Sequence, residues 1–326
     1  MMQAPGPFRL EPVFLEKVWA ARHLPPALAG LWPAPEMTGE IWLASDRHRV
    51  TPVAEGPLAG QGLDQVTARW GSWLLGQEPR PGQGFPLLLK ILSVGQWLSV
   101  QVHPDDEQAA RLENEPWGKS EAWHILEAEK DAAIIMGLEP GVDRQALARA
   151  VAEKRLGQVL ARVPARPGDT FHLPAGTVHA AGPGLCFFEV QQSSDVTYRF
   201  YDWDRLGLDG KPRQLHQDKA LAVMKTSGPG RPFPPRELES GPARLTLLVE
   251  DEHFALLRVE AAADYAPSWG GRRLRLVLVL SGRGRWVGPA GGELLPGQCW
   301  VVPAGLEGAL IRPQAGGLVL LESLAL

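Results

Sequence analysis

The chain has 326 residues, of which 44% are hydrophobic and 21% charged, and its formal net charge is −4. This length supports a sizeable core, and the balanced charges give no electrostatic reason to expect binding to nucleic acid or to a membrane surface. The two cysteines are far apart, the N-terminus carries no apolar leader, and no apolar run is long enough to span a bilayer, so we expect a cytoplasmic protein.

Short apolar, β-branched segments separated by turn residues recur along the chain, as is typical of β-strands. The first predicted strands are residues 86–94, 97–103, 121–128, 132–138, 169–176 and 186–192. Among them, residues 143–163 carry apolar side chains near helical spacing behind Asp143, a suitable N-cap, so we expect a helix there. A Pro-rich stretch and a linker at 235–245 precede a second group of predicted strands: 244–250, 254–260, 274–280, 285–288, 298–305 and 317–324.

An internal repeat indicates how these strands are organised. PGDTFHLPAGTVHAA (167–181) aligns without gaps with PGQCWVVPAGLEGAL (296–310), so a supersecondary unit is repeated. Each copy reads as a strand entered from a Gly turn and left through a Pro-Ala-Gly turn. We therefore predict a mainly β fold of two cupin-type jelly-roll β-barrels with a few helices. The predicted domains are a catalytic, metal-binding one over 1–235, which includes the helical stretch, and a second one over 236–326 without metal ligands.

The two copies differ at one informative position, because His179 in the first copy aligns with Gly308 in the second. A histidine needed only for the scaffold would be expected in both copies. We therefore expect the first barrel to be functional and the second to be structural.

A second polar feature points to the same barrel. Gln101 and His103 share one face of an otherwise apolar strand, where unpaired polar groups are costly to bury. Our hypothesis is a mononuclear metal site formed by His103, Glu121 and His179, with Gln101 as a candidate fourth ligand. Two imidazoles and a carboxylate suit a borderline divalent ion with one position left open, and the ligand types fit zinc and non-haem Fe(II) equally. The alternative is that both histidines are hydrogen-bonded barrel residues and Glu121 is a solvated charge.

Two cations are candidates for binding an anionic group near this site. Arg199 lies among aromatic residues that could hold a guanidinium rigidly, and arginine binds phosphate or carboxylate through two parallel hydrogen bonds. Lys119 precedes Glu121 by two residues and would share its strand face. The alternatives are an Asp–Arg structural network for Arg199 and a surface position for Lys119.

Four segments together resemble the signature segments of type I mannose-6-phosphate isomerase in its short bacterial form: QVHPDD (101–106), GKSEAW (118–123), PAGTVHA (174–180) and QQSSDVTYRFYDWDR (191–205). Three N-terminal segments are also similar to that family: EKVW (16–19), GEIWLASD (39–46) and FPLLLKIL (85–92). The resemblance covers most of residues 10–220 and is weak beyond about residue 240. One departure is Ala20–Ala21, where relatives usually carry glycines.

The resemblance implies a zinc-dependent aldose–ketose isomerase that interconverts mannose 6-phosphate and fructose 6-phosphate through a cis-enediolate. It implies one Zn²⁺ per chain on His103, Glu121 and His179, with the Gln101 position a ligand in longer relatives. It also matches Arg199 and Lys119 to an active-site arginine and lysine. The expected partner is a small sugar phosphate, while the general base and the oligomeric state are not indicated.

Two other functions fit the same ligand residues. An Fe(II) cupin oxygenase would consume oxygen, but it would have little need for the pair of cations at 119 and 199. A non-catalytic cupin that binds sugar phosphates would keep the metal as a structural ion and leave its ligand unconverted.

Overall fold

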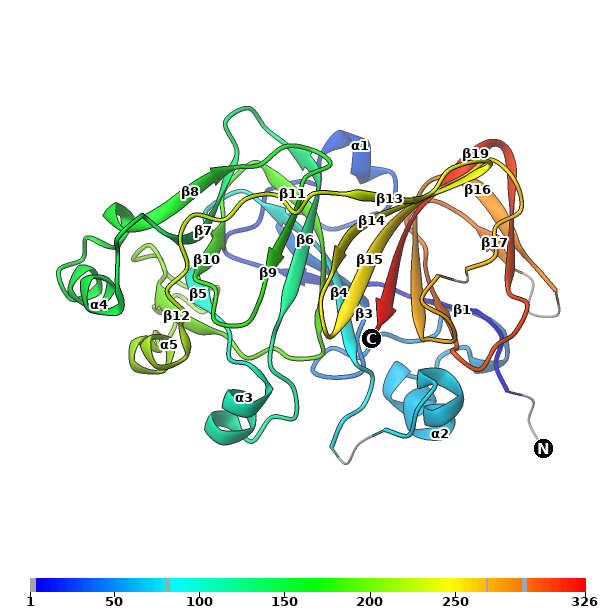
Figure 1. The fold of residues 1–326 in the computed structure, drawn as a ribbon, viewed down its shortest axis with the longest axis horizontal. Coiled ribbons are helices and arrows are strands. Elements are labelled where there is room, and N and C mark those ends of the chain that lie inside the picture. The colour runs from blue at the N-terminus through cyan, green and yellow to red at the C-terminus, as the bar shows by residue number, and fades with distance from the viewer. Residues whose placement is uncertain (1–3, 80–81, 268, 289–291) are drawn as a thin grey trace. The chain divides into compact units, whose positions relative to one another are not determined.

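The computed structural model describes residues 4–79, 82–267, 269–288 and 292–326 (Figure 1). The chain packs as two compact units. One contains Phe14–Ile41 and Lys90–Phe233; the other contains the residues up to Val13, Trp42–Leu89 and Pro234–Leu326. The functional division into domains over 1–235 and 236–326 stays a prediction.

Two sheets contain the strands that carry the predicted metal ligands. The five-stranded sheet has the order β12-β5-β10-β7-β8 and the six-stranded sheet the order β2-β3-β4-β11-β6-β9. The strands of the first are β5 (Val100–Val102), β7 (Ala133–Leu138), β8 (Leu160–Pro164), β10 (His179–Ala181) and β12 (Tyr198–Tyr201). Those of the second are β2 (Val13–Glu16), β3 (Thr38–Ala44), β4 (Leu87–Val94), β6 (Glu121–Ala128), β9 (Thr170–Leu173) and β11 (Leu185–Gln192).

One apolar core lies between these two sheets. The five-stranded sheet contributes Ile134, Val163 and Ala181 to it, and the six-stranded sheet contributes alternate residues of four strands: Leu92, Val94, Trp123, Ile125, Phe171, Leu173, Leu185 and Phe187. Because strand side chains alternate between faces, the residues that continue these rows also face the same interior.

A second core covers the other face of the five-stranded sheet. It joins Val100 and Val102 of β5 to side chains from helices α4 (Arg144–Ala152) and α5 (Gln217–Val223). Figure 1 shows both helices beside this sheet. The valines of β5 thus face the helices, which leaves Gln101 to face the interior between the sheets.

The helix predicted over 143–163 is wrong in its second half. Asp143 does cap α4, since its Oδ1 accepts a hydrogen bond from the amide of Ala146 at 2.7 Å. The helix ends at Ala152, and a short 3-10 turn η2 (Leu156–Gln158) then leads into strand β8, which pairs with β7. The apolar residues at near-helical spacing do share one core, but they reach it from a helix, a turn and a strand.

The unit with the C-terminus contains an eight-stranded sheet of order β1-β18-β16-β19-β15-β14-β13, with β17 paired to β16. Its strands are β1 (Phe8–Leu10), β13 (Arg236–Glu239), β14 (Ala243–Glu250), β15 (Phe254–Ala261), β16 (Arg275–Val287), β17 (Glu293–Leu294), β18 (Cys299–Val302) and β19 (Leu310–Ala325). The linker predicted at 235–245 is wrong, because 236–239 form edge strand β13 and β14 begins at Ala243. The mainly β fold class is confirmed.

The remaining elements are helices α1 (Pro26–Ala29), α2 (Leu63–Leu75) and α3 (Asp106–Glu113) and the 3-10 turn η1 (Gly56–Leu58). Among the described residues, no helix is both long and apolar enough to cross a membrane.

Candidate metal centre

Strand register aligns three of the predicted site residues in one row. Within the five-stranded sheet, Gln101 of β5 lies opposite His179 of β10 on one side and opposite Arg199 of β12 on the other. Directly opposed residues of antiparallel strands point to the same face. The side chains of Arg199, Gln101 and His179 therefore project from the same face of this sheet. The valines of β5 project from the opposite face, which the helices cover.

The other two predicted residues flank the same interior. His103 follows the last residue of β5, and Glu121 is the first residue of β6 in the six-stranded sheet. Trp123 and Ile125, which continue the row of Glu121, lie in the core between the sheets. Glu121 therefore points inward, toward the face that carries His179.

The structure brings His103, Glu121 and His179 together. One ligand atom of each lies within 4.8 Å of those of the other two. Glu121 Oε1 is 3.0 Å from His179 Nε2, and Glu121 Oε2 is 3.6 Å from His103 Nε2. All three residues are at most 1% exposed, so the alternative of a solvated Glu121 does not describe this arrangement.

Backbone carbonyls fix the histidine tautomers. His103 Nδ1 lies 2.8 Å from the carbonyl oxygen of Val196, and His179 Nδ1 lies 2.9 Å from that of Thr177. A carbonyl only accepts, so both Nδ1 atoms carry the proton and, in the neutral rings, both Nε2 atoms present a lone pair. Of the two oxygens of buried Glu121, Oε2 lies 2.7 Å from the Lys119 ammonium and Oε1 faces His179 Nε2. Lone pairs that converge in this way fit a cation, because a metal ion satisfies all of them at once.

Electrostatics keep His103 and Glu121 in the forms that bind a metal. Burial, together with the nearby Lys119 ammonium, holds the pKa of His103 well below its usual range, so its imidazole is neutral at pH 7. Burial raises the pKa of Glu121, but the Lys119 ammonium and the two imidazoles more than offset this and lower it well below its usual range. Glu121 is therefore a carboxylate.

Gln101 lies beside the cluster, and its amide nitrogen faces it. Its Nε2 is 3.3 Å from His179 Nε2, while its Oε1 accepts a hydrogen bond from Ser99 Oγ at 3.1 Å. Coordination would require the amide to present its oxygen instead. Its role as the fourth ligand stays a prediction.

Lys119 is not a surface residue. It is 4% exposed, and its Nζ lies 2.7 Å from Glu121 Oε2 and 3.3 Å from His103 Nε2. The ammonium therefore adjoins the proposed ligand atoms.

Arg199 is half-buried and carries no anionic partner among the described residues. Its buried Nε donates no hydrogen bond, and burial, followed by the neighbouring Arg213 guanidinium, lowers its pKa. The nearby Asp202 carboxylate instead binds Arg205 and Arg213. An Asp–Arg network thus exists here, but it leaves Arg199 outside.

Two buried charged residues near the site were missed in the sequence. Glu189 of β11 accepts a hydrogen bond from Trp123 Nε1 at 2.8 Å, and Lys90 of β4 lies 3.4 Å from its other oxygen. Burial, and then the Glu121 carboxylate, raise the pKa of Glu189. Each is the single charged residue of an otherwise apolar strand, at a position whose side chain faces the interior between the sheets. A lone charge at such a position could have identified both residues in the sequence.

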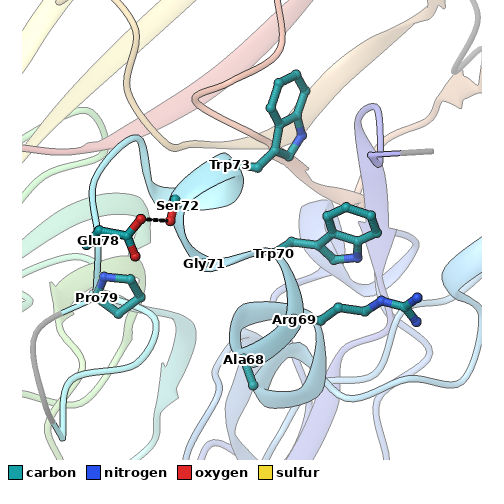
Figure 2. A pocket seen from close by; sticks show the side chains of 8 residues that line it. All are labelled: Ala68, Arg69, Trp70, Gly71, Ser72, Trp73, Glu78 and Pro79. Carbon is teal, nitrogen blue, oxygen red and sulfur yellow. Dashed lines mark hydrogen bonds between the residues drawn. The ribbon is translucent and has the colours of Figure 1, made fainter. Parts of the chain in front are cut away.

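A cavity of about 290 Å³ lies elsewhere, where helix α2 bends at Trp70 (Figure 2). Residues 68–73, Glu78 and Pro79 line it, and the side chains of Ser72 and Glu78 are hydrogen-bonded to one another. None of the predicted site residues lies there.

Comparison with known proteins identifies the family. The model of the type I phosphomannose isomerase catalytic domain matches residues 8–123. The chain is 37% identical over 281 residues to the probable mannose-6-phosphate isomerase GmuF of Bacillus subtilis, an alignment that covers 86% of this chain and 87% of that protein. The chain belongs to the type I phosphomannose isomerase family.

Other members of the family agree with this assignment. The mannose-6-phosphate isomerase of Streptococcus mutans is 35% identical over 281 residues, which cover 84% of this chain and 86% of that protein. The crystal structure of the Bacillus subtilis mannose 6-phosphate isomerase matches with a TM-score of 0.86 at 29% identity, over 98% of this chain and 99% of that one. The family resemblance predicted from the sequence is thus confirmed, and the chain is an isomerase of this family.

Proposed function

We propose that this phosphomannose isomerase family member interconverts D-mannose 6-phosphate and D-fructose 6-phosphate, with one zinc ion held by His103, Glu121 and His179 and by Gln101 as fourth ligand. The observation that carries the proposal is the convergence of the Nε2 atoms of His103 and His179 on the buried Glu121 carboxylate. The relatives from Bacillus subtilis and Streptococcus mutans are named as mannose-6-phosphate isomerases, which supports mannose 6-phosphate as the substrate.

The reaction moves a proton between C2 and C1 of the sugar through a cis-enediolate, and negative charge develops on the oxygens of both carbons. Zinc bound by these ligands would supply a Lewis acid that stabilises this charge more in the transition state than in the ground state. The protein's own contribution is to hold the two imidazoles and the carboxylate in place. Their burial excludes bulk water, which strengthens electrostatic interactions at the site.

Lys119 and Arg199 would bind the anionic groups of the substrate. The Lys119 ammonium adjoins the cluster, so it is placed to contact the oxygens of the reacting carbons. The Arg199 side chain projects from the same sheet face as that of His179, two strands away. Its guanidinium lacks an anionic partner among the described residues. A phosphate would supply that partner through two parallel hydrogen bonds.

The test is to follow fructose 6-phosphate formation from mannose 6-phosphate before chelation, after chelation and after adding back Zn²⁺, Fe²⁺ or Mg²⁺. We expect conversion that a chelator abolishes and that Zn²⁺ restores. Restoration by Fe²⁺ alone, with consumption of oxygen, would support the oxygenase alternative. Binding without conversion at every metal loading would reject the isomerase proposal.

A further inference from the structure

We propose that Asp106 and Gln192 are positioning residues that fix the backbone of residues 118–120, and thereby the locations of Lys119 and Glu121. Neither side chain contacts the three clustered ligands in the metal site. The effect on turnover rests on the proposed function, whereas the effect on metal affinity can be measured without it.

The backbone before Glu121 needs partners that regular structure does not provide. Residues 118–120 are buried and belong to neither helix nor strand. Their three successive amides donate to the Asp106 carboxylate at 2.7 Å, to the carbonyl of Pro104 at 2.9 Å and to Gln192 Oε1 at 2.9 Å. Two of the three acceptors are side chains, so two substitutions would leave buried amides unsatisfied.

Asp106 and Gln192 act as one connected pair. The same oxygen of Asp106 that accepts from Gly118 also accepts from Gln192 Nε2 at 2.8 Å. The amide group of Gln192 therefore bridges Asp106 to Ser120, with its donor and its acceptor both used. Removal of the Asp106 carboxylate would leave the amide of Gly118 and the side-chain Nε2 of Gln192 without this acceptor.

This network joins the segments that flank all three ligands. Pro104 and Asp106 follow His103, and residues 118–120 precede Glu121. Ser120 Oγ accepts from the amide of Ala175 at 3.2 Å, and the carbonyl of His103 accepts from the amide of Gly176 at 2.9 Å, in the turn before His179. The relative placement of the ligands is thus set outside the cluster.

Gly118 permits the close approach on which the network depends. A Cβ at this position would lie 2.4 Å from the backbone carbon of Asp105 and 2.5 Å from the nitrogen of Asp106. No side chain can be accommodated there without moving backbone. The two segments are therefore in direct contact at a position that only glycine fits.

Lys119 is the middle residue of this backbone segment. Its amide donates to the carbonyl of Pro104, and its Nζ lies 2.7 Å from Glu121 Oε2. A displacement of about 1 Å in a catalytic group can cost about 10²-fold in rate.

The neighbouring Asp105 offers a matched control. Its carboxylate caps helix α3 by accepting from the amide of Gln108 at 2.9 Å, and it makes no contact with residues 118–120 that the structure records. These two adjacent aspartates are both partly exposed, but the Asp105 carboxylate binds the first turn of α3 and the Asp106 carboxylate binds Gly118. Asp105→Ala removes a helix cap, whereas Asp106→Ala removes the support of the ligand segment.

The experiment compares Asp106→Ala, Asp106→Asn and Asp105→Ala in the full chain. Zn²⁺ affinity is measured by competition with a chromophoric chelator, and amide hydrogen exchange is measured for the peptide that spans 117–121. Melting temperature, kcat and KM for mannose 6-phosphate are measured on the same samples.

We expect Asp106→Ala to lower Zn²⁺ affinity and kcat by about 10- to 100-fold each and to speed exchange at 117–121. Asp106→Asn keeps an acceptor oxygen and should recover most of the loss. Asp105→Ala should lower the melting temperature by about 1–4 °C with Zn²⁺ affinity within about twofold of wild type.

Equal losses of Zn²⁺ affinity in Asp105→Ala and Asp106→Ala would overturn the proposal, because the effect would then be general destabilisation. Unchanged Zn²⁺ affinity and exchange in Asp106→Ala would also overturn it. If wild-type protein binds Zn²⁺ but does not isomerise mannose 6-phosphate, the proposed function fails, while the affinity ranking still decides the positioning role.

Discussion

Two buried glutamates, one in each unit, have opposite surroundings. Glu322 of β19 accepts a hydrogen bond from Tyr265 at 2.6 Å and pairs with the buried Arg275 guanidinium at 2.5 Å. Glu121 is just as buried, but its Oε2 pairs with the Lys119 ammonium at 2.7 Å and its Oε1 faces His179 Nε2 at 3.0 Å. The first carboxylate is bound by donors of the fold alone, whereas the second lies among atoms that could also hold a metal ion.

The two units also differ at the end of the internal repeat. The copies form β9 in one unit and β18 in the other, and each is followed by the Pro-Ala-Gly turn. His179 then starts strand β10, whereas its counterpart Gly308 has a positive φ of 68° and lies outside any strand. The same strand module thus leads to a residue of the candidate metal centre in one unit and to a turn in the other.

The largest expected effect comes from removing a ligand. His179→Ala should abolish stoichiometric Zn²⁺ binding and lower kcat by at least about 10³-fold, because the Lewis acid contributes several kcal/mol of transition-state stabilisation. Metal analysis and kcat on the same preparation check this. Full activity in a metal-free His179→Ala protein would remove the metal hypothesis.

Arg199→Ala should separate substrate binding from metal binding. Without a guanidinium for the anionic group, we expect kcat/KM to fall by about 10²–10³-fold while Zn²⁺ content stays at the wild-type level. Metal analysis with steady-state kinetics distinguishes the two. Loss of Zn²⁺ in this variant would contradict the assignment of Arg199 to the substrate.

The third prediction concerns Glu322, the buried glutamate of the other unit. Glu322→Gln leaves the buried Arg275 charge uncompensated, so it should reduce the free energy of unfolding by about 3–5 kcal/mol, with Zn²⁺ content unchanged. Urea unfolding measures the loss. As a matched control, Glu260→Gln removes a carboxylate that binds Arg244 and Arg258 near the surface, and it should cost less than about 1 kcal/mol.

The smallest effect concerns a partnered carboxylate of the unit that contains the candidate metal centre. Glu113 accepts hydrogen bonds from Lys219 and Tyr198, and these hold its pKa below the ordinary 4.5. Its contribution to stability is therefore present above pH 4.5 and is lost as the pH falls through the folded-state pKa. Glu113→Gln should be slightly less stable than wild type at pH 7, with a gap that narrows below pH 4.5.

Urea midpoints of both proteins between pH 7 and pH 3 measure this gap. A gap that widens on acidification would contradict the sign of the pKa shift. Zn²⁺ affinity at pH 7 should be the same in both proteins, as for Glu322→Gln, because in each case the missing carboxylate is one that the fold has already neutralised.

Much of the fold follows from the sequence because its strands are short, apolar and bounded by turns. The predicted strand at 121–128 coincides with β6, and the one at 186–192 differs from β11 by one residue. The errors arise where partners distant in sequence decide the outcome. Residues 160–164 become a strand because β7 offers an open edge, and 236–239 because β14 does. Local spacing contains no information about either edge.

The grouping of His103, Glu121 and His179 was predictable because alternation identifies the inward face and the repeat identifies the unit. The network around residues 118–120 was not, because Asp106 and Gln192 are 86 residues apart and each is an ordinary polar residue beside a strand or helix. The same holds for Glu189 and Trp123, whose hydrogen bond depends on the register of β6 and β11. Pairings of this kind exist only once the strands are aligned.

Strand β5 is three residues long, and this brevity limits how the chain can change. Because neighbouring side chains point to opposite faces, one inserted or deleted residue within β5 would reverse the face of those beyond it. His103 would then turn toward the helices, and a valine would turn toward Glu121. The length of β5 therefore limits viable sequence changes as strictly as the identity of the proposed ligand residues does. Viable insertions are expected only outside this strand.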